Sequence, residues 1–398
     1  MYYERTLSAV AKQCAASFKV LMVTGPRQVG KTTLLKHLME SDRTYVSLDD
    51  ISAATLAQND PELFFQMYQP PVFIDEVQRA PQLFPYIKLL VDKSEKRGSI
   101  WLSGSQQFSL MQNIAESLAG RVGILDLQGF SISELQRDIT RPPYLPSFIT
   151  EPCPVRGITE IFDAIVQGSY PQVHNGITDR NLFYSSYIRT YLERDVRQLL
   201  NISDESAFVT FLKVIASRTG QLINYNDIAR DVGKTAKTIK AWMSILQTSG
   251  LIYILQPYYN NIGQRAVKTP KFYFMDTGLC CYLCGISSGE AALSIPMSGA
   301  LFETYVVSEI LKSYYHNGQN PHIYFYRNAL QQEIDLIIEQ NGKLYPVEIK
   351  QTGTPTEKMV KNFSVIGKDN YGLGSVICMA DKFIPMNKEV YITPIDYI

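Results

Sequence analysis

Two glycines that frame a short loop, followed by a lysine and a threonine, are the residues of this chain whose spacing most directly predicts chemistry. Gly25 and Gly30 have four residues between them, and Lys31 and Thr32 come next. In a G-x-x-x-x-G-K-T loop, backbone N–H groups surround phosphate oxygens, the lysine reaches the β- and γ-phosphates, and the threonine hydroxyl binds Mg²⁺. The loop therefore predicts ATP and Mg²⁺ as ligands, with a cradle made of Gly25, Pro26, Arg27, Gln28, Val29, Gly30, Lys31, Thr32 and Thr33.

An acidic pair follows another apolar stretch of the chain. Residues 72–74 are Val, Phe and Ile, and Asp75 and Glu76 come directly after them. At the end of a buried strand beside a phosphate loop, the first acid would hold Mg²⁺ through water. The second would polarise the attacking water as a general base. Taken alone, the segment also fits a buried strand that ends in a solvated acidic pair, but the loop upstream favours the catalytic interpretation.

The elements that must position these residues follow from the hydrophobic pattern. Residues 19–24 are a short run rich in β-formers, and LLKHLMES after the loop has helical periodicity, so the loop joins a strand to a helix. Further strands are predicted at residues 44–48, 72–76, 100–105 and 122–127, with a helix over residues 82–96. This alternation of strands and helices predicts an α/β domain with a parallel sheet.

Two more residues of this region have both a catalytic and a structural interpretation. The order of elements resembles P-loop ATPases with an additional strand, in which a polar residue after that strand senses the γ-phosphate. Ser105 would take that role, although Ser-Gly-Ser is also ordinary turn chemistry. Arg121 follows a predicted helix, where an arginine finger would be supplied to a neighbouring subunit. A basic side chain at a helix C-terminus also interacts favourably with the helix dipole, so both interpretations of Arg121 stay open.

Acidic residues and a lysine near the C-terminus predict a second site. Asp335 interrupts an apolar run, and Glu348 and Lys350 flank Ile349, so the two lie on one face of a strand. In such a D-(x)12-E-x-K arrangement, Asp335 and Glu348 bind Mg²⁺ or Mn²⁺ and Lys350 orients or activates the hydrolytic water. Glu303, on a predicted helix, matches the helical acid that completes such sites in related resolvases. A solvated pair on an edge strand is the simpler alternative for the E-x-K motif alone.

These motifs together resemble the prokaryotic AAA-plus ATPases that carry a C-terminal domain of unknown function with a restriction-endonuclease-like core. The resemblance covers almost the whole chain and is carried by GPRQVGKTTLL, VFIDEVQ, LSGSQQ, SLAGR, GSYPQV, YLERDV, KFYFMDTGL, LFETYVVSEI, EIDLII and PVEIK. It implies an additional-strand (ASCE) ATPase core with a five-stranded parallel sheet, in a cytoplasmic protein. For the C-terminal domain it implies an αβββα fold. It leaves open whether that domain cleaves nucleic acid or only binds a nucleic acid or a protein.

A basic segment lies between these two regions. Residues 208–271 contain nine basic and two acidic side chains, although the whole chain has 38 of each. Helical patterns over residues 225–232 and 234–248, joined at Gly233, are typical of a helix-turn-helix. Strands at 251–256 and 271–275 would form the hairpin of a wing, with Arg265 and Lys268 in its loop.

The second of these helices has an apolar and a basic face. Apolar side chains recur at helical spacing, and the lysines point away from them; the apolar set is Ile239, Trp242, Met243 and Leu246, and the basic set is Lys234, Lys237 and Lys240. Contact of residues 208–271 with DNA is the functional interpretation, with this helix in the major groove. A protein-docking or lid module is the alternative.

Composition excludes several classes of protein. The formal net charge is zero, so a protein that coats polyanions by bulk charge is excluded. Six cysteines without regular spacing do not form a secreted disulfide framework. The N-terminus has no secretion signal, and no run approaches the roughly 18 apolar residues that span a bilayer. A cytoplasmic protein without a membrane partner is therefore expected.

Four segments and one leading function are predicted. The segments are a P-loop ATPase domain (1–138), a linker with helices (139–207), a winged-helix-like domain (208–276) and a restriction-endonuclease-like domain (277–398). The leading function is Mg²⁺-dependent hydrolysis of ATP to ADP and phosphate, with the nucleotide state coupled to a DNA-contacting winged helix and a nuclease-like domain, in a monomer or a homo-oligomer. The alternative is a nucleotide-controlled regulatory or scaffolding switch whose nuclease-like domain is inactive. A repressor that uses ATP as its effector ranks last, because lysines read bases less well than Arg, Asn or Gln.

Overall fold

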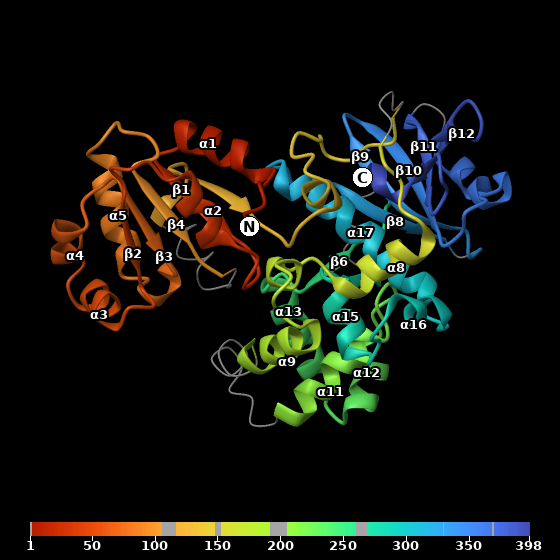
Figure 1. The fold of residues 1–398 in the computed structure, drawn as a ribbon, viewed down its shortest axis with the longest axis horizontal. Coiled ribbons are helices and arrows are strands. Elements are labelled where there is room, and N and C mark those ends of the chain that lie inside the picture. Colours follow the sequence, from red (N-terminus) through yellow and green to blue (C-terminus); the bar gives the residue numbers. More distant parts are fainter. Residues whose placement is uncertain are drawn as a thin grey trace.

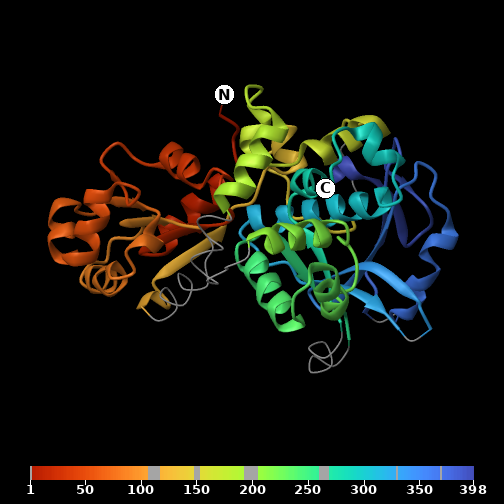
Figure 2. The same ribbon diagram turned by 90° about the horizontal axis from the view of Figure 1, so that it is seen from below.

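Two β-sheets lie at opposite ends of the molecule and are joined by a block of helices (Figures 1 and 2). The computed structural model describes residues 2–105, 117–147, 153–191, 205–259, 269–328, 330–367 and 370–398. In Figure 1 the N-terminal sheet is red to orange, the helical block yellow through green to teal, and the C-terminal sheet blue. Within the described ranges, no helix is long and apolar enough to cross a membrane.

Five parallel strands form the N-terminal sheet, in the order β2-β3-β4-β1-β5. They are β1 (Val20–Thr24), β2 (Thr44–Ser47), β3 (Val72–Asp75), β4 (Ile100–Ser103) and β5 (Val122–Asp126). All residues of β1, β3 and β4 are buried, as expected for parallel strands that helices cover on both faces. The predicted five-stranded parallel sheet is confirmed, and β4 is the strand inserted between β1 and β3.

Helices cover both faces of this sheet. The elements are α1 (Leu7–Ser17) and α2 (Lys31–Leu38) on one face, and α3 (Ile51–Asn59), α4 (Pro61–Met67) and α5 (Leu83–Asp92) on the other, with a 3-10 turn η1 (Val77–Arg79) after β3. Leu21 points into the first core and Met22 into the second, since side chains alternate along a strand. The predicted helix over 82–96 ends early because residues 93–98 have no apolar side chain to bury. Residues 106–116, which precede the end of the helix predicted before Arg121, lie outside the described residues.

The helical block follows β5. Its elements are α7 (Ile132–Leu135), α8 (Ile158–Gln167), η2 (Pro171–His174), α9 (Arg180–Tyr191), α11 (Glu205–Ala216), α12 (Tyr225–Val232), α13 (Ala236–Thr248), α15 (Thr277–Leu283) and α16 (Gly289–Ser294). Helices α12 and α13 meet at Gly233, whose φ of 69° is left-handed. The predicted helix pair is therefore present. Helix α11 ends at Ala216, and Gly220, with a φ of 78°, turns the chain towards α12.

A hairpin completes this block. Strand β6 (Ile252–Leu255) pairs antiparallel with β7 (Lys271–Phe274), as predicted. The hairpin loop at 260–268, with Arg265 and Lys268, lies outside the described residues, as do residues 192–200 of the predicted helical segment and most of the YLERDV motif.

Six strands form the C-terminal sheet, in the order β12-β13-β11-β10-β9-β8. They are β8 (Ile323–Arg327), β9 (Glu333–Gln340), β10 (Lys343–Lys350), β11 (Gly374–Cys378), β12 (Ile384–Pro385) and β13 (Val390–Pro394). Strands β8, β9 and β10 are antiparallel, and β10, β11 and β13 are parallel. The predicted order of a helix followed by three strands is present. The second helix of the expected αβββα order is a 3-10 helix, η4 (Glu357–Val365).

One long helix, α17 (Ser298–His316), lies between the two sheets (Figure 1). It contacts α1 and β5 of the N-terminal part, α8 and β7 of the helical block, and β10 of the C-terminal sheet. Its buried side chains include polar ones, among them Thr304, Glu309, Lys312 and His316. Because buried polar groups need partners, these side chains of α17 form specific contacts with the N-terminal part and the helical block.

Candidate nucleotide site and C-terminal acidic cluster

The loop between β1 and α2 has the geometry of a phosphate cradle. Gly25 has a φ of 138° and Gly30 a φ of 95°, where a side chain is disfavoured. A Cβ on Gly25 would lie 2.0 Å from the carbonyl oxygen of Leu127. Helix α2 begins at Lys31, whose Nζ donates to the carbonyls of Gly25 at 3.0 Å and Pro26 at 2.7 Å. Strand, loop and helix N-terminus thus follow in the predicted order, which favours an anion at the loop.

Thr32 and Asp75 meet at the carboxyl edge of the sheet. The Thr32 Oγ1 atom lies 3.0 Å and 2.9 Å from the two carboxylate oxygens of Asp75. The same carboxylate accepts from the hydroxyl of Tyr45 at 3.2 Å and from that of Ser103. Hydroxyl and carboxylate oxygens are the donors that Mg²⁺ prefers, so the set predicted from the sequence fits this ion.

Glu76 and Ser105 lie close to one another and are joined by Gln78, a residue for which the sequence predicted no role. Glu76 has a left-handed backbone with a φ of 57°. The Gln78 Nε2 atom donates to the Glu76 carboxylate and lies 3.3 Å from the Ser105 Oγ atom. The signal in the sequence was a polar side chain two positions after the acidic pair.

Arg5 ties the phosphate loop to the segment that follows β5. Its guanidinium donates to the carbonyls of Val29 at 3.0 Å and Gln128 at 2.7 Å, and to Glu134 Oε1 at 3.0 Å. Burial raises the pKa of Glu134, but the charges of Arg5 and His316 lower it below its ordinary value overall. No local pattern predicts this contact, because Arg5 and Glu134 are 129 residues apart.

The end of α17 packs its histidine against the same segment. The His316 Nδ1 atom lies 3.3 Å from Glu134 Oε1, and the N–H of Gln128 donates to His316 Nε2 at 3.3 Å. Burial lowers the pKa of His316 to about 4, so the imidazole is neutral at pH 7.

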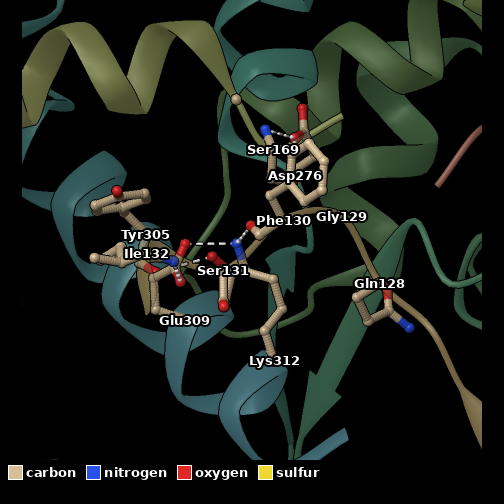
Figure 3. A network of polar contacts seen from close by, with 12 residues as sticks. Gln128, Gly129, Phe130, Ser131, Ile132, Ser169, Asp276, Tyr305, Glu309 and Lys312 are labelled. Carbon is tan, nitrogen blue, oxygen red and sulfur yellow. Dashed lines mark hydrogen bonds and ion pairs between the residues drawn. The ribbon is translucent and has the colours of Figure 1, made fainter. Parts of the chain in front are cut away.

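Figure 3 shows further buried contacts of α17 with the segment after β5. Lys312 Nζ donates to the carbonyl of Phe130 at 2.8 Å and pairs with Glu309. The N–H of Ile132 donates to Glu309 Oε2 at 2.9 Å. Lys312 and Glu309 thus neutralise each other while both hold the chain between the N-terminal sheet and α7.

Asp276 joins the helical block to this junction (Figure 3). Its carboxylate accepts from the N–H of Ser169 at 2.6 Å, from the Ser169 hydroxyl at 2.8 Å and from the hydroxyl of Tyr184 at 2.8 Å. The carbonyl of Ser169 accepts from the N–H of Phe130 at 2.7 Å. The motifs GSYPQV and KFYFMDTGL, for which the sequence predicted no role, therefore meet beside the phosphate loop.

Arg121 lies at the edge of the sheet opposite the phosphate loop. The next residue, Val122, pairs with Val20 at the start of β1, whereas the loop follows the end of β1. The guanidinium binds the Asp92 carboxylate through Nε–Oδ1 at 2.5 Å and Nη2–Oδ2 at 3.0 Å. In a single copy of the chain, Arg121 thus forms a surface ion pair with Asp92, and both of its predicted roles stay predictions.

Asp335, Glu348 and Lys350 lie together, as the strand pattern predicts. The antiparallel register of β9 and β10 places the two acids opposite each other. Lys350 Nζ lies 3.0 Å from Asp335 Oδ2 and 2.7 Å from Glu348 Oε1. The other oxygen, Glu348 Oε2, is buried and has no hydrogen-bond partner among the described residues. Such an oxygen has an unfilled acceptor position, to which a water or a hard cation can bind.

Burial and neighbouring charges shift the pKa values of Glu348 and Lys350. Burial and the charge of Asp335 raise the pKa of Glu348 to about 8. Burial acts to lower the pKa of Lys350, but the charges of Asp335 and Glu348 raise it above its ordinary value. Lys350 therefore keeps its proton at pH 7, so it can orient a water or stabilise negative charge but cannot take a proton from water.

Glu303 forms its hydrogen bond and its ion pair with residues other than the two acids of β9 and β10, and its role as a third metal ligand stays a prediction. Among the described residues, no group of three or more His, Cys, Asp or Glu is placed to hold a metal ion. Glu303 Oε1 instead accepts from the hydroxyl of Tyr273 at 2.6 Å and lies 3.4 Å from Lys271 Nζ. Lys271, on β7, also lies 2.6 Å from Glu333 Oε1. An ammonium group from the hairpin thus balances the charge of Glu303.

The basic face of the helical block is smaller than the charge count predicted. Lys237 and Lys240 are exposed on α13, opposite its buried stripe, as expected. Several other basic residues of segment 208–271 form ion pairs within the protein. Lys271 is buried and pairs with Glu333, Arg218 pairs with Asp231, and Arg230 pairs with Asp227. The overall excess of positive charge therefore overstates the surface available to a phosphate backbone.

Family models match three parts of the chain. Residues 17–136 match a model described as an AAA domain, which covers the phosphate loop and the parallel sheet. Residues 158–290 match a domain of unknown function (DUF8612), and residues 298–398 match another domain of unknown function (DUF4143).

Similar whole chains come from mycobacteria. An uncharacterized protein of Mycobacterium tuberculosis and one of Mycobacterium bovis are each 29% identical to this chain over 381 residues, or 95% of this chain and 80% of the relative. Among solved structures, a Walker-type ATPase of Pyrococcus abyssi is 14% identical, covers 70% of this chain and 94% of its own, and has a TM-score of 0.42. The AAA match agrees with the phosphate loop, the parallel sheet and the acids beside them. The chain is therefore similar to AAA domains over residues 17–136, which carry the phosphate loop, and to a domain of unknown function over residues 298–398.

Proposed function

We propose that this protein hydrolyses ATP to ADP and phosphate in a Mg²⁺-dependent reaction. The observation that carries the proposal is the contact of the Thr32 hydroxyl with both carboxylate oxygens of Asp75, next to the phosphate loop. The oxygen of a water attacks the γ-phosphorus while Glu76 takes a proton from that water. The bond from the γ-phosphorus to the bridging oxygen breaks, and ADP leaves with that oxygen.

Thr32 and Asp75 would hold the magnesium ion, which supplies positive charge against the phosphates when bound. Lys31, whose ammonium group contacts the carbonyls of Gly25 and Pro26, can exchange them for phosphate oxygens. Ser105 would sense the γ-phosphate. Arg121 is assigned to its ion pair rather than to a finger for a neighbouring subunit.

We also propose that the nucleotide state reaches the rest of the molecule through the segment after β5. Arg5 bonds both to the phosphate loop, at Val29, and to Gln128 and Glu134. Helix α17 holds the same segment through Lys312, and near its N-terminus Glu303 contacts Lys271, which also pairs with Glu333 of β9. A shift of the loop on nucleotide binding would therefore move contacts on a helix that extends to the C-terminal sheet.

Loss of Lys31 tests the proposed ATP hydrolysis. The Lys31→Ala variant is expected to lose ATP turnover by at least about 10²-fold, because it removes a cation that stabilises charge on the transferred phosphoryl group. Phosphate release from purified protein in Mg²⁺ measures this. Lys12→Ala, which removes an exposed lysine of α1, is the matched control and should keep full turnover. Equal turnover in wild type and Lys31→Ala would contradict the proposal.

The exposed face of α13 is proposed to contact DNA. Duplex DNA is expected to stimulate ATP hydrolysis by the wild type, and the double variant Lys237→Ala, Lys240→Ala should lose the stimulation while keeping basal turnover. Removal of each lysine that neutralises a DNA phosphate should also lower the slope of log affinity against log salt by about 0.9. Stimulation that persists in the double variant would favour a protein-docking or lid role for this module.

A second candidate function is metal-dependent phosphodiester cleavage at the C-terminal cluster, and the unpartnered Glu348 Oε2 atom favours it. Asp335 and Glu348 would hold Mg²⁺ or Mn²⁺, which supplies a polarised water. Lys350, with its raised pKa, would stabilise charge on the phosphate.

Cleavage of linear, supercoiled and branched DNA with Mg²⁺ or Mn²⁺, with and without ATP, tests this candidate. Lys350→Ala is expected to lower the cleavage rate by about 10²–10³-fold, as for loss of one charge-stabilising donor. Lys343→Ala, at the exposed start of the same strand, is the control and should cleave normally. No cleavage under any condition, with ATP hydrolysis intact, would favour a nucleotide-controlled switch whose C-terminal domain is inactive.

A further inference from the structure

Gln78 lies between the two polar residues that follow β3 and β4. It belongs to η1, the short turn after the acidic pair. Its amide nitrogen donates to a carboxylate oxygen of Glu76 and lies 3.3 Å from the hydroxyl oxygen of Ser105. An ionised carboxylate can only accept hydrogen bonds, so the nitrogen of the amide must be the atom that faces Glu76. One side chain therefore holds both the proposed base and the proposed γ-phosphate sensor.

The oxygen of the same amide is left without a partner. Gln78 Oε1 is buried and accepts no hydrogen bond from the described residues. Buried polar atoms nearly always have partners, and exceptions gather where a ligand or water completes the contact. Glu76, the residue that Gln78 contacts, has a left-handed backbone, which is sparsely populated for residues other than glycine. Such conformations cluster at functional sites.

We propose that Gln78 positions both Glu76 and the water that attacks ATP. The inference rests on the proposed ATP hydrolysis and adds a residue to that site. The amide nitrogen fixes the orientation of the Glu76 carboxylate, and Oε1 accepts one hydrogen of the water. The other hydrogen of the water passes as a proton to Glu76 while its oxygen bonds to the γ-phosphorus and the bond to the bridging oxygen breaks. The contact of Gln78 with Ser105 links the position of the amide to the γ-phosphate, which Ser105 would sense.

Kinetics of Gln78 variants test the proposal. Gln78→Ala and Gln78→Met, which keeps the side-chain length without the amide, should each lower kcat by on the order of 10²-fold, the effect of a misplaced reacting group. The KM for ATP should change by less than about twofold, because the phosphate cradle is untouched. Gln58→Ala removes an amide that bonds to the Arg79 carbonyl beside the same turn and is the control, with unchanged kcat.

A double-mutant cycle separates this role from a structural one. In a Glu76→Gln background, Gln78→Ala should cause almost no further loss, because residues that act as a unit are not additive. Binding of a non-hydrolysable ATP analogue should stay the same in all variants. Unchanged kcat in both Gln78 variants, a loss that appears in KM, or an additive cycle would each overturn the inference. If the wild type does not hydrolyse ATP at all, the proposed function fails first, and this result is distinct from all three.

Discussion

Replacement of Glu76 by glutamine is expected to give a protein that binds ATP and does not hydrolyse it. The proposed general base loses its ability to take a proton, and such a group contributes about 10²–10⁴-fold to a rate. The new amide keeps an oxygen that can still accept from Gln78, so the surrounding contacts are preserved. Phosphate release measures turnover, and filtration of protein incubated with labelled ATP measures the nucleotide that stays bound.

Glu62→Gln is the matched control for this prediction. Glu62 is an exposed acid in the first turn of α4, away from the phosphate loop, and its replacement should change neither quantity. Hydrolysis that continues at the wild-type rate in Glu76→Gln would remove Glu76 from the role of base. Loss of ATP binding in that variant would show that Glu76 is needed to bind ATP.

Mild acid is expected to destabilise the protein through His316. Its pKa is lowered by burial to about 4, against an ordinary value of 6.5. The unfolded chain therefore takes up a proton as pH falls below 6.5, whereas the folded chain does so only near pH 4. The free energy of unfolding should fall by about 3 kcal/mol across this window from His316 alone, of which about 2 kcal/mol is lost by about pH 5.

Denaturant unfolding of wild type and His316→Gln at several pH values measures this contribution. The pKa of Glu348 is raised to about 8, so its protonation stabilises the folded protein as pH falls and opposes the effect of His316. The difference in free energy of unfolding between wild type and His316→Gln therefore isolates the contribution of His316. Glu134, with a lowered pKa, contributes only below its ordinary value of 4.5. His322→Gln, at an exposed histidine before β8, should keep the wild-type pH dependence. Parallel curves for wild type and His316→Gln would contradict the prediction.

Sequence patterns predicted the local parts of both sites. The glycines, Lys31 and Thr32 form one continuous loop, and the apolar run before Asp75 identifies a strand without knowledge of its neighbours. Alternation along a strand places Glu348 and Lys350 on one face because the side-chain period of a strand is two residues. These predictions succeed where the interacting residues are close in the sequence or are related by the geometry of one element.

Tertiary structure decided which of these parts meet. Thr32 contacts Asp75 across 43 residues of sequence because β1, β4 and β3 are parallel, so the residues after β1 and the end of β3 lie at the same edge of the sheet. Glu303 lies within reach of Lys271 because the hairpin strand β7 packs against α17. The same global arrangement put Arg121 at the far edge of the sheet.

The P-loop, its acidic partner and the acidic pair of C-terminal strands are predictable from the sequence, since each depends on the order and period of neighbouring residues. The junction of Arg5, Glu134, Lys312 and His316 is visible only in the folded chain, as is the position of the Gln78 amide between Glu76 and Ser105. These side chains carry no periodic signal. Their partners are chosen by the need of each buried polar group for a complementary group, and that need arises only once distant segments have packed together.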